Sequence, residues 1–171
     1  SLLSKNFKKI KEKTLKEVSE RDKTYGVLSK KFKFNFKKKD LIKFNQFKSV
    51  AIIGMGGSIL GSEAIYYFLK KKIKKKFYFF NDLNIEKISD FKRDKNTNRI
   101  LFLIISKSGN TIETLSNLLA LNILKKNKKN IILLSEKSDN YLFNLSKKLN
   151  IYYIEHKNYI GGRYSVLSEV G

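Results

Sequence analysis

The sequence predicts an α/β domain, a three-layer sandwich in which helices cover both faces of a doubly wound, five-stranded parallel sheet. Three observations predict this fold. From Ser49 onward, short β-branched and apolar runs alternate with helical patterns. The run 100–105 is apolar throughout, which suits a central parallel strand buried on both faces. Turns rich in glycine or hydroxyl residues follow three of the predicted strands, at the edge where open α/β sheets bind ligands.

The elements of this domain follow one another in regular order. Five segments have the strand pattern: residues 50–53, 77–80, 100–105, 131–134 and 151–154. Four segments between them have the helical pattern: residues 58–70, 85–91, 111–126 and 141–149. At this spacing each strand–helix–strand unit forms a right-handed crossover, so we expect all five strands to run parallel.

The first 48 residues are lysine-rich and less regular, and we interpret them as a helical and extended arm. Leu3, Phe7 and Ile10 recur at helical spacing, which predicts an amphipathic helix over residues 2–19. The rest of the arm, residues 25–47, predicts a loop or short helices.

Three phenylalanines in this arm alternate with lysine and asparagine. Phe32, Phe34 and Phe36 form either a short strand or the aromatic anchors of an extended segment, and the sequence does not choose between the two.

Residues 49–171 form the predicted domain. The sequence stops at Gly171, just inside a helix predicted to begin near Ser165. We therefore expect the domain to be truncated at its C-terminal end and the natural chain to continue.

The composition indicates a folded, cytoplasmic protein. Hydrophobic residues make up 42% of the 171, which argues against disorder. The apolar runs are too short to cross a bilayer, and no secretory signal opens the chain, so we expect no membrane partner. Cysteine is absent, which excludes disulfides and thiolate metal sites.

The net charge of +22 is the one feature that suggests nucleic acid as a partner. The basic residues are 33 lysines and only 4 arginines, and arginine is the residue that contacts bases in a bidentate manner. The lysines gather in runs near the ends of predicted helices, where they complement the helix dipole. We expect no nucleic-acid partner.

The first turn that could bind a ligand, residues 54–61, reads Gly-Met-Gly-Gly-Ser-Ile-Leu-Gly. Glycines let a ligand approach the backbone, and the following helix presents free N–H groups. A competing interpretation is a dinucleotide-binding fingerprint, in which Asp82 would bind a ribose. However, Ile59 occupies the position of the third glycine of that fingerprint. A tight turn without a ligand is the simplest alternative.

The second turn, 106–111, reads Ser-Lys-Ser-Gly-Asn-Thr. Three hydroxyls and an amide around a glycine can surround a tetrahedral anion at a helix N-terminus. The simpler interpretation is that Asn110 or Thr111 caps the helix, helped by Glu113 or Thr114. A P-loop is excluded, because the glycines that it needs before the lysine are missing.

The third turn follows the last predicted strand and places a rare arginine, Arg163, after Gly161 and Gly162. A guanidinium there can stabilise an oxyanion or a phosphate. A surface arginine at a turn is the simpler interpretation.

Together, the three turns resemble, in order and spacing, the sugar isomerase (SIS) domain, and more narrowly the first such domain of the glucose-6-phosphate isomerase family. The segments that carry the resemblance are Gly56-Gly57-Ser58, residues 106–111 and Gly161-Gly162-Arg163-Tyr164-Ser165. The last is the most specific, because generic SIS domains do not have it. The resemblance covers residues 49–171 and implies a flavodoxin-like strand order.

The resemblance also implies roles for residues. The substrate phosphate would be held by Ser106, Ser108 and Thr111, with Lys107 nearby. Gly57 and Ser58 would line the sugar, and Arg163 would stabilise the enediolate as the catalytic residue. Family members interconvert glucose 6-phosphate and fructose 6-phosphate without a metal or another cofactor, which implies a hexose phosphate substrate and a homodimer for the full-length protein.

Two catalytic groups of the family have no counterpart here, its general-base glutamate and its ring-opening histidine. The resemblance does not make Glu169 the base, and we interpret His156, the only histidine, as an ordinary strand-end residue. We therefore expect this chain alone to be inactive. The alternative function is a non-catalytic, phosphosugar-binding regulatory module.

Overall fold

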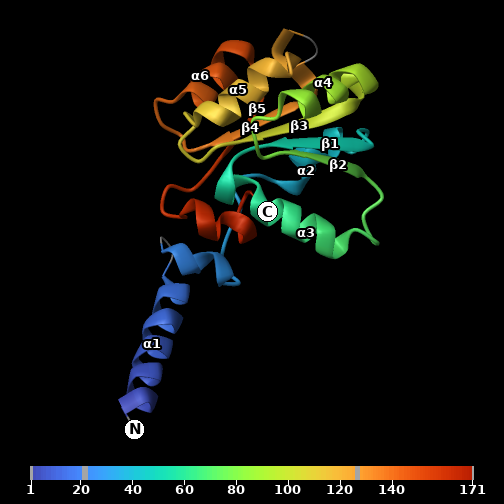
Figure 1. The fold of residues 1–171 in the computed structure, drawn as a ribbon. Coiled ribbons are helices and arrows are strands. Elements are labelled where there is room, and N and C mark those ends of the chain that lie inside the picture. Colours follow the sequence, from blue (N-terminus) through green and yellow to red (C-terminus); the bar gives the residue numbers. More distant parts are fainter. Residues whose placement is uncertain (1, 21–22, 126–127, 171) are drawn as a thin grey trace.

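The computed structural model describes residues 2–20, 23–125 and 128–170; the side chains of Leu2, Asp94 and Arg163 also lie outside the description. Five parallel strands form one sheet in the order β2-β1-β3-β4-β5, which confirms the predicted fold (Figure 1). Their bounds are β1 (Ser49–Ile53), β2 (Lys76–Phe80), β3 (Ile100–Ile105), β4 (Ile131–Ser135) and β5 (Tyr152–Glu155).

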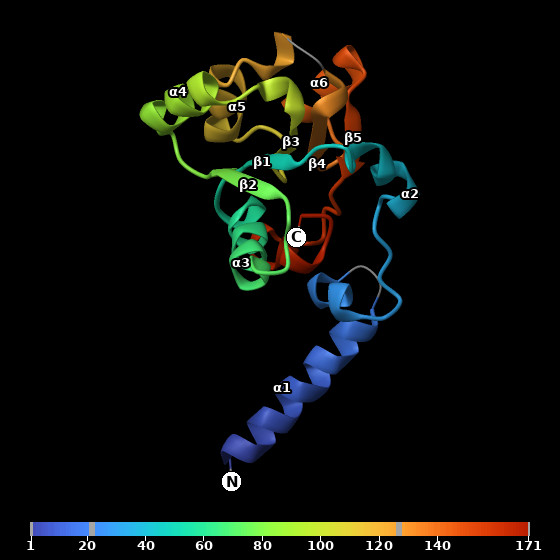
Figure 2. The ribbon, with the colours of Figure 1, turned by 90° about the vertical axis from the view of Figure 1, so that its right-hand side faces the viewer.

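Helices cover the sheet unequally. Figures 1 and 2 show different helices over the two faces, with the C-terminal turns beside α3. The first face carries α4 (Ile85–Asp94), α5 (Ile112–Ala120) and α6 (Tyr141–Leu149), and the second carries α3 (Leu60–Leu69). Short 3₁₀ turns connect these elements: η3 (Gly56–Ser58), η4 (Thr97–Arg99), η5 (Ile123–Lys125), η6 (Lys128–Asn130) and η7 (Gly162–Leu167).

The strands are buried on both faces, as their continuous apolar runs predict. In β4, Ile131 and Leu133 join the core beneath α4, α5 and α6, whereas Ile132 and Leu134 join a second core on the opposite face. This alternation follows from the two-residue period of a strand. Both cores together fix the strand ends from which the candidate site is built.

Three predicted helices have different bounds in the structure, and one of them, α4, runs to Asp94 instead of ending at Phe91. The helix expected from Ser58 begins at Leu60, because residues 56–58 form η3 instead. The helix expected to reach Lys126 ends at Ala120, because Asn122 adopts a left-handed conformation with φ 53°. Lys126 itself lies outside the described residues.

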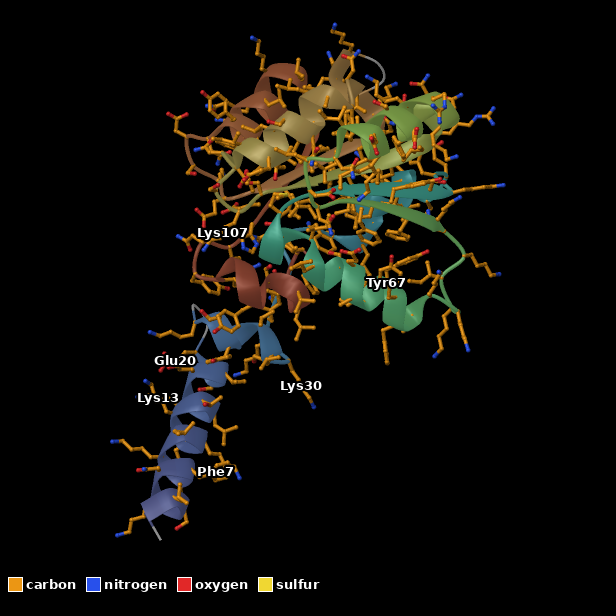
Figure 3. The ribbon with its side chains drawn as sticks, viewed as in Figure 1. Phe7, Lys13, Glu20, Lys30, Tyr67 and Lys107 are labelled. Carbon is orange, nitrogen blue, oxygen red and sulfur yellow. The ribbon has the colours of Figure 1, made fainter. Side chains whose placement is uncertain are left out.

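The N-terminal helix α1 (Leu2–Ser19) has the predicted bounds and projects away from the sheet (Figures 1 and 2). Its apolar side chains Leu3, Phe7 and Ile10 are 81%, 69% and 65% exposed. Figure 3 shows Phe7 and Lys13 on this projecting helix. Among the described residues, no helix is long and apolar enough to cross a membrane.

The remainder of the arm consists of short helices and loops: η1 (Thr24–Leu28), α2 (Lys38–Leu41) and η2 (Ile42–Phe44). The phenylalanines do not form a strand; the rings of Phe32, Phe34 and Phe36 pack against one another in series, with centroids 5.4 and 5.2 Å apart. Further along, Phe44 and Phe47 are buried in the second core. The arm therefore supplies part of the cover of the sheet, and the division at residue 48 stays a prediction.

Candidate functional site

The first two turns start side by side. β1 and β3 are paired neighbours, with Ile53 opposite Ile104, so their loops leave the same edge of the sheet. The helix after β1 and the helix after β3 lie on opposite faces, which makes this the switch point where open α/β sheets bind ligands. A Cβ on Gly54 would lie 3.0 Å from the carbonyl oxygen of Ile105, so only glycine lets the two loops approach this closely.

The first turn is a 3₁₀ turn rather than the start of an α-helix. Gly56 has φ +52°, in the left-handed region that glycine favours. Gly57 and Ser58 follow it and are both half-buried. Their backbone therefore lies at the mouth of the switch point, where a ligand could reach it.

The side-chain hydroxyls of the second turn lie close together. Ser106 Oγ and Thr111 Oγ1 are 2.8 Å apart, and Ser108 Oγ lies 3.5 Å from Thr111 Oγ1. The Gly109 N–H donates to Ser106 Oγ at 3.1 Å, and the Asn110 N–H donates to Ser108 Oγ at 3.3 Å. Three hydroxyls thus meet at the N-terminus of α5, as the sequence predicts for an anion site.

The capping alternative for this turn is wrong. Thr111 occupies the N-cap position of α5, but its side chain makes no capping hydrogen bond there among the described residues. Asn110 caps a different helix, because its Oδ1 accepts the Tyr141 N–H of α6 at 2.9 Å. The first N–H groups of α5 are therefore without a side-chain cap.

The second turn is also locked to the loop that follows β4. Gly109 has φ +69°, and a Cβ there would overlap the side chain of Asn140. Asn140 Oδ1 accepts the Phe143 N–H at 2.9 Å, and its Nδ2 donates to the Glu136 carbonyl at 2.8 Å. The Leu142 N–H donates to the Gly109 carbonyl at 3.2 Å. Sequence reasoning missed Asn140, although an asparagine immediately before a predicted helix is a recognisable capping signal.

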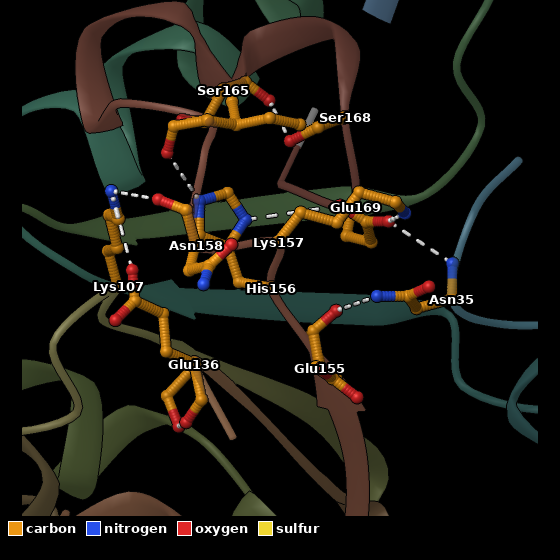
Figure 4. Close-up of polar contacts among 12 residues, drawn as sticks. Asn35, Lys107, Glu136, Glu155, His156, Lys157, Asn158, Ser165, Ser168 and Glu169 are labelled. Atoms are coloured by element: carbon orange, nitrogen blue, oxygen red, sulfur yellow. Dashed lines mark hydrogen bonds and ion pairs between the residues drawn. The ribbon is translucent and has the colours of Figure 1, made fainter. Parts of the chain in front are cut away.

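Lys107 does not point at these hydroxyls. Its Nζ donates to the Asn158 carbonyl at 2.9 Å and lies 3.3 Å from Glu136 Oε1 (Figure 4). Figure 3 places it beside the sheet, near the ribbon of η7. Its charge therefore links the second turn to the loops after β4 and β5.

The third turn packs against the first. Ser165 Oγ in η7 lies 2.6 Å from the Gly162 carbonyl oxygen and 3.1 Å from the Gly57 carbonyl oxygen, and it shares its one hydrogen between them. A Cβ on Gly61 would lie 2.5 Å from Val166 Cγ2, so α3 and η7 are in close contact. The expected helix near Ser165 is thus a 3₁₀ turn. The side chain of Arg163, the predicted catalytic residue, lies outside the described residues, although its backbone is part of η7.

His156 and Glu169 are both buried behind the third turn. His156 is 1% exposed, and its Nε2 lies 3.2 Å from the Ile160 carbonyl. Burial lowers the pKa of His156, while the bond to Ile160 and the charges of Glu169 and Glu136 oppose this effect and Lys107 adds to it. The ring is therefore neutral near pH 7. A single histidine in an unremarkable context gave no sequence signal for this burial.

This edge of the sheet presents hydrogen-bond donors of the kind that a small anion needs. The hydroxyls and the uncapped N–H groups of α5 are donors for phosphate oxygens, and the Gly57–Ser58 backbone lies beside them. Within the described ranges, no group of three or more histidine, aspartate or glutamate side chains is placed to hold a metal ion.

Comparisons with known proteins agree with this geometry. The family model "Phosphoglucose isomerase" matches residues 13–171. Glucose-6-phosphate isomerase of Borreliella burgdorferi (strain ZS7) is 36% identical over 138 residues, which cover 74% of this chain and 26% of the relative. The probable glucose-6-phosphate isomerase of Methanococcus maripaludis is 37% identical and covers 73% of this chain and 30% of the relative. The chain thus spans less than a third of the length of these relatives.

Solved structures share the fold. A hypothetical protein from Thermus thermophilus superposes with a TM-score of 0.68 at 26% identity, covering 74% of this chain and 32% of that protein. A glucose-6-phosphate isomerase from Chlamydia trachomatis has a TM-score of 0.65 at 23% identity, covering 76% and 26%. The sheet order, the three converging turns and the family match lead to one conclusion. The chain belongs to the phosphoglucose isomerase family.

Proposed function

We propose that this chain is the sugar-phosphate-binding part of a glucose-6-phosphate isomerase, which interconverts glucose 6-phosphate and fructose 6-phosphate in glycolysis and gluconeogenesis. The observation that carries the proposal is the cluster of Ser106, Ser108 and Thr111 hydroxyls at the uncapped N-terminus of α5. This cluster lies one strand away from Gly57 and Ser58. The family match over residues 13–171 supports the same substrate class.

The hydroxyls bind the phosphate in this proposal. An incoming phosphate oxygen replaces the weak contact of 3.5 Å between Ser108 and Thr111, and the N–H groups of α5 donate to the same anion. Lys107 contributes positive charge at the rim, although its amine stays bound to Glu136. The Gly57 and Ser58 backbone then contacts the sugar.

Arg163 acts on the reacting carbons. Isomerisation moves a proton between C1 and C2 through an enediolate, whose negative charge needs a fixed cation in a site with little water. The backbone of η7 is held against the first turn through Ser165, so the arginine segment borders the sugar position. The general base and the ring-opening histidine come from other parts of the longer, homodimeric protein.

Two measurements test this function. Isothermal titration of the chain with glucose 6-phosphate should give saturable binding that inorganic phosphate competes for, and Ser106→Ala should weaken it. A coupled isomerase assay on the full-length gene product should show turnover, and Arg163→Ala should lower kcat by about 10²–10³-fold. The conservative control Arg93→Lys, on the exposed end of α4, should leave turnover unchanged.

The outcomes separate the candidate functions. Phosphosugar binding without turnover in the full-length product would favour the regulatory module over the enzyme. A hexose phosphate held away from the 106–111 turn would contradict the proposed site. Affinity for nucleic acid that falls steeply with salt would indicate a different function altogether.

A further inference from the structure

A buried carboxylate lies at the C-terminal end of the segment that carries Arg163. The side chain of Glu169 is 0% exposed. A carboxylate removed from water is stable only with ionic or hydrogen-bonding partners. The partners of Glu169 therefore show one of the contacts that hold the end of this segment, in addition to the Ser62 hydroxyl, which donates to the Val170 carbonyl at 2.6 Å.

One oxygen of Glu169 joins three parts of the chain. Lys157 Nζ, in the loop after β5, forms an ion pair and hydrogen bond with Oε1, and the Asn35 N–H of the arm donates to the same oxygen at 3.1 Å (Figure 4). The Lys157 side chain is only 14% exposed, so the pair is almost wholly shielded from water. Asn35 Nδ2 also donates to the Glu155 carbonyl at 3.1 Å, which fixes the arm against β5.

The other oxygen faces histidine. Glu169 Oε2 lies 3.9 Å from His156 Nδ1, and neither atom has a hydrogen-bond partner among the described residues. A carbonyl oxygen only accepts, so the contact between His156 Nε2 and the Ile160 carbonyl places the ring hydrogen on Nε2. Nδ1 of the neutral ring is then an acceptor that faces a carboxylate oxygen. A proton taken up by this histidine would be directed at Glu169.

The segment between these contacts carries the catalytic arginine of the proposed function. Just before the segment, His156 Nε2 is hydrogen-bonded to the Ile160 carbonyl. In its middle, the Ser165 hydroxyl is hydrogen-bonded to the Gly57 carbonyl. At its end, Glu169 forms the ion pair with Lys157. Figure 4 shows Ser165, His156 and Glu169 gathered on one side of the sheet edge. Arg163 lies between the first two of these anchors.

We propose that Glu169 is a positioning residue: its carboxylate ties the 161–170 segment, and with it Arg163, to the loop after β5 and to the arm. The proposal rests on the proposed function for the part that concerns Arg163. Glu169 acts through the segment and does not touch the substrate, because its carboxylate is fully buried against Lys157.

The first test measures whether the 161–170 segment stays attached, and it does not depend on enzyme activity. In the 171-residue chain, Glu169→Gln should speed hydrogen exchange about a hundredfold at the amides of Asn35, Tyr164 and Ser168, because a broken buried pair opens the segment. Exchange in the 106–111 turn should stay within twofold. The matched control is Glu155→Gln, an exposed carboxylate on the adjacent strand, which should change neither region.

The single histidine provides an independent signal. Ring ¹⁵N shifts of His156 should show the Nε2–H tautomer in the unmodified chain. Glu169→Gln should lower the pKa of His156 further, because it removes a charge that favours the imidazolium. Glu136→Gln should lower it less and Lys107→Met should raise it, since these are the other charged groups that face the ring. An unchanged pKa in Glu169→Gln would contradict the placement of this carboxylate beside His156, and with it the buried geometry on which the tether rests.

A second variant covers the case in which Glu169→Gln does not fold. Lys157→Met combined with Glu169→Gln leaves no unpaired buried charge, so it should fold while still lacking the tether. Fast exchange at Tyr164 and Ser168 in this double variant would support the proposal. Exchange as slow as in the unmodified chain would contradict it.

Kinetics of the full-length gene product then separate positioning from general stability. Glu169→Gln should lower kcat about tenfold or more and leave KM for fructose 6-phosphate within twofold, because the phosphate turn is intact. Equal loss in kcat and in folded fraction would overturn the positioning role. If the unmodified product has no isomerase activity, the proposed function fails, while the exchange and titration results still decide whether Glu169 is the tether.

Discussion

Two stretches of the same sheet edge are held in different ways. The 106–111 turn is fixed mainly by neutral hydrogen bonds among its own hydroxyls and by the Asn140 loop behind it, and its one ion pair, Lys107 with Glu136, is partly exposed. The 161–170 segment is held by the Ser165 hydroxyl, by the Ser62 hydroxyl on the Val170 carbonyl and by the buried ion pair of Glu169. Neutral bonds do not change with ionisation, whereas a buried pair needs both charges. Phosphate binding and carbon chemistry should therefore respond separately to mutation.

The largest expected difference comes from the same substitution made in both stretches. Gly109→Ala should lower the free energy of unfolding by about 2 kcal/mol or more, since alanine is strained at φ +69° and its Cβ would overlap Asn140. Gly162→Ala should change it by less than about 0.5 kcal/mol, because a Cβ there meets nothing within 4 Å. Urea denaturation measures both. Equal losses would contradict the contrast between the two stretches.

The next largest effect concerns the loop behind the first stretch. Asn140→Ala should cost about 1–2 kcal/mol, because it removes the cap of α6 and the bond to the Glu136 carbonyl. It should also weaken phosphosugar binding, since the Gly109 turn loses its support. The comparison is Asn144→Ala, an exposed position on the same helix that bonds only Asp139 through its side chain among the described residues, and it should lower stability less. Thermal unfolding and titration calorimetry together distinguish the two variants.

A smaller effect, on affinity alone, should follow from Thr111→Val. The methyl group replaces the hydroxyl that lies 2.8 Å from Ser106 Oγ, so the fold is kept while one phosphate donor is lost. Glucose 6-phosphate should bind about 5–10-fold more weakly, which corresponds to one neutral hydrogen bond. Calorimetric titration is the measurement. Unchanged affinity would contradict the proposal that the phosphate binds at this turn.

The smallest effect is the pH dependence contributed by His156. Its pKa in the fold is below the ordinary value of 6.5, so the unfolded chain takes up a proton at higher pH than the folded chain does. The stability that the neutral histidine contributes is present above pH 6.5 and is lost as the pH falls below it, by at most about 1.4 kcal/mol per pH unit. Urea denaturation of the unmodified chain and of His156→Gln between about pH 7.5 and 5.5 should show this difference shrinking with acid. A constant difference would mean that the folded pKa is not lowered.

The sequence predicted the sheet well because its signal is local. β3 is an unbroken apolar run, and α6 lies between an asparagine cap and a left-handed Asn150, so both have the predicted bounds. The end of α5 was missed, because Asn122 is an ordinary residue in a helical pattern until its conformation is known. The positions of the strands and turns were thus easier to predict from the sequence than the backbone conformations at their ends.

The supports of the site could not be predicted, because they join residues far apart in the chain. Asn35 and Glu169 are 134 positions apart, and no periodicity brings them together. The Lys107 contact with the Asn158 carbonyl spans 51 positions. Motif spacing located the hydroxyls and the arginine segment, while the contacts that hold them required the three-dimensional arrangement.

The arm's distant partners have a consequence for synthesis of the protein on the ribosome. The Phe44 ring meets Tyr152 with centroids 5.5 Å apart, and Thr24 Oγ1 donates to the Tyr159 carbonyl across 135 positions. At about 5–20 residues per second, these early residues wait on the order of ten seconds for their partners to emerge. Throughout that interval Phe44 and Thr24 lack these two partners, so the arm can complete its docking only after β5 and the loop behind it have been made.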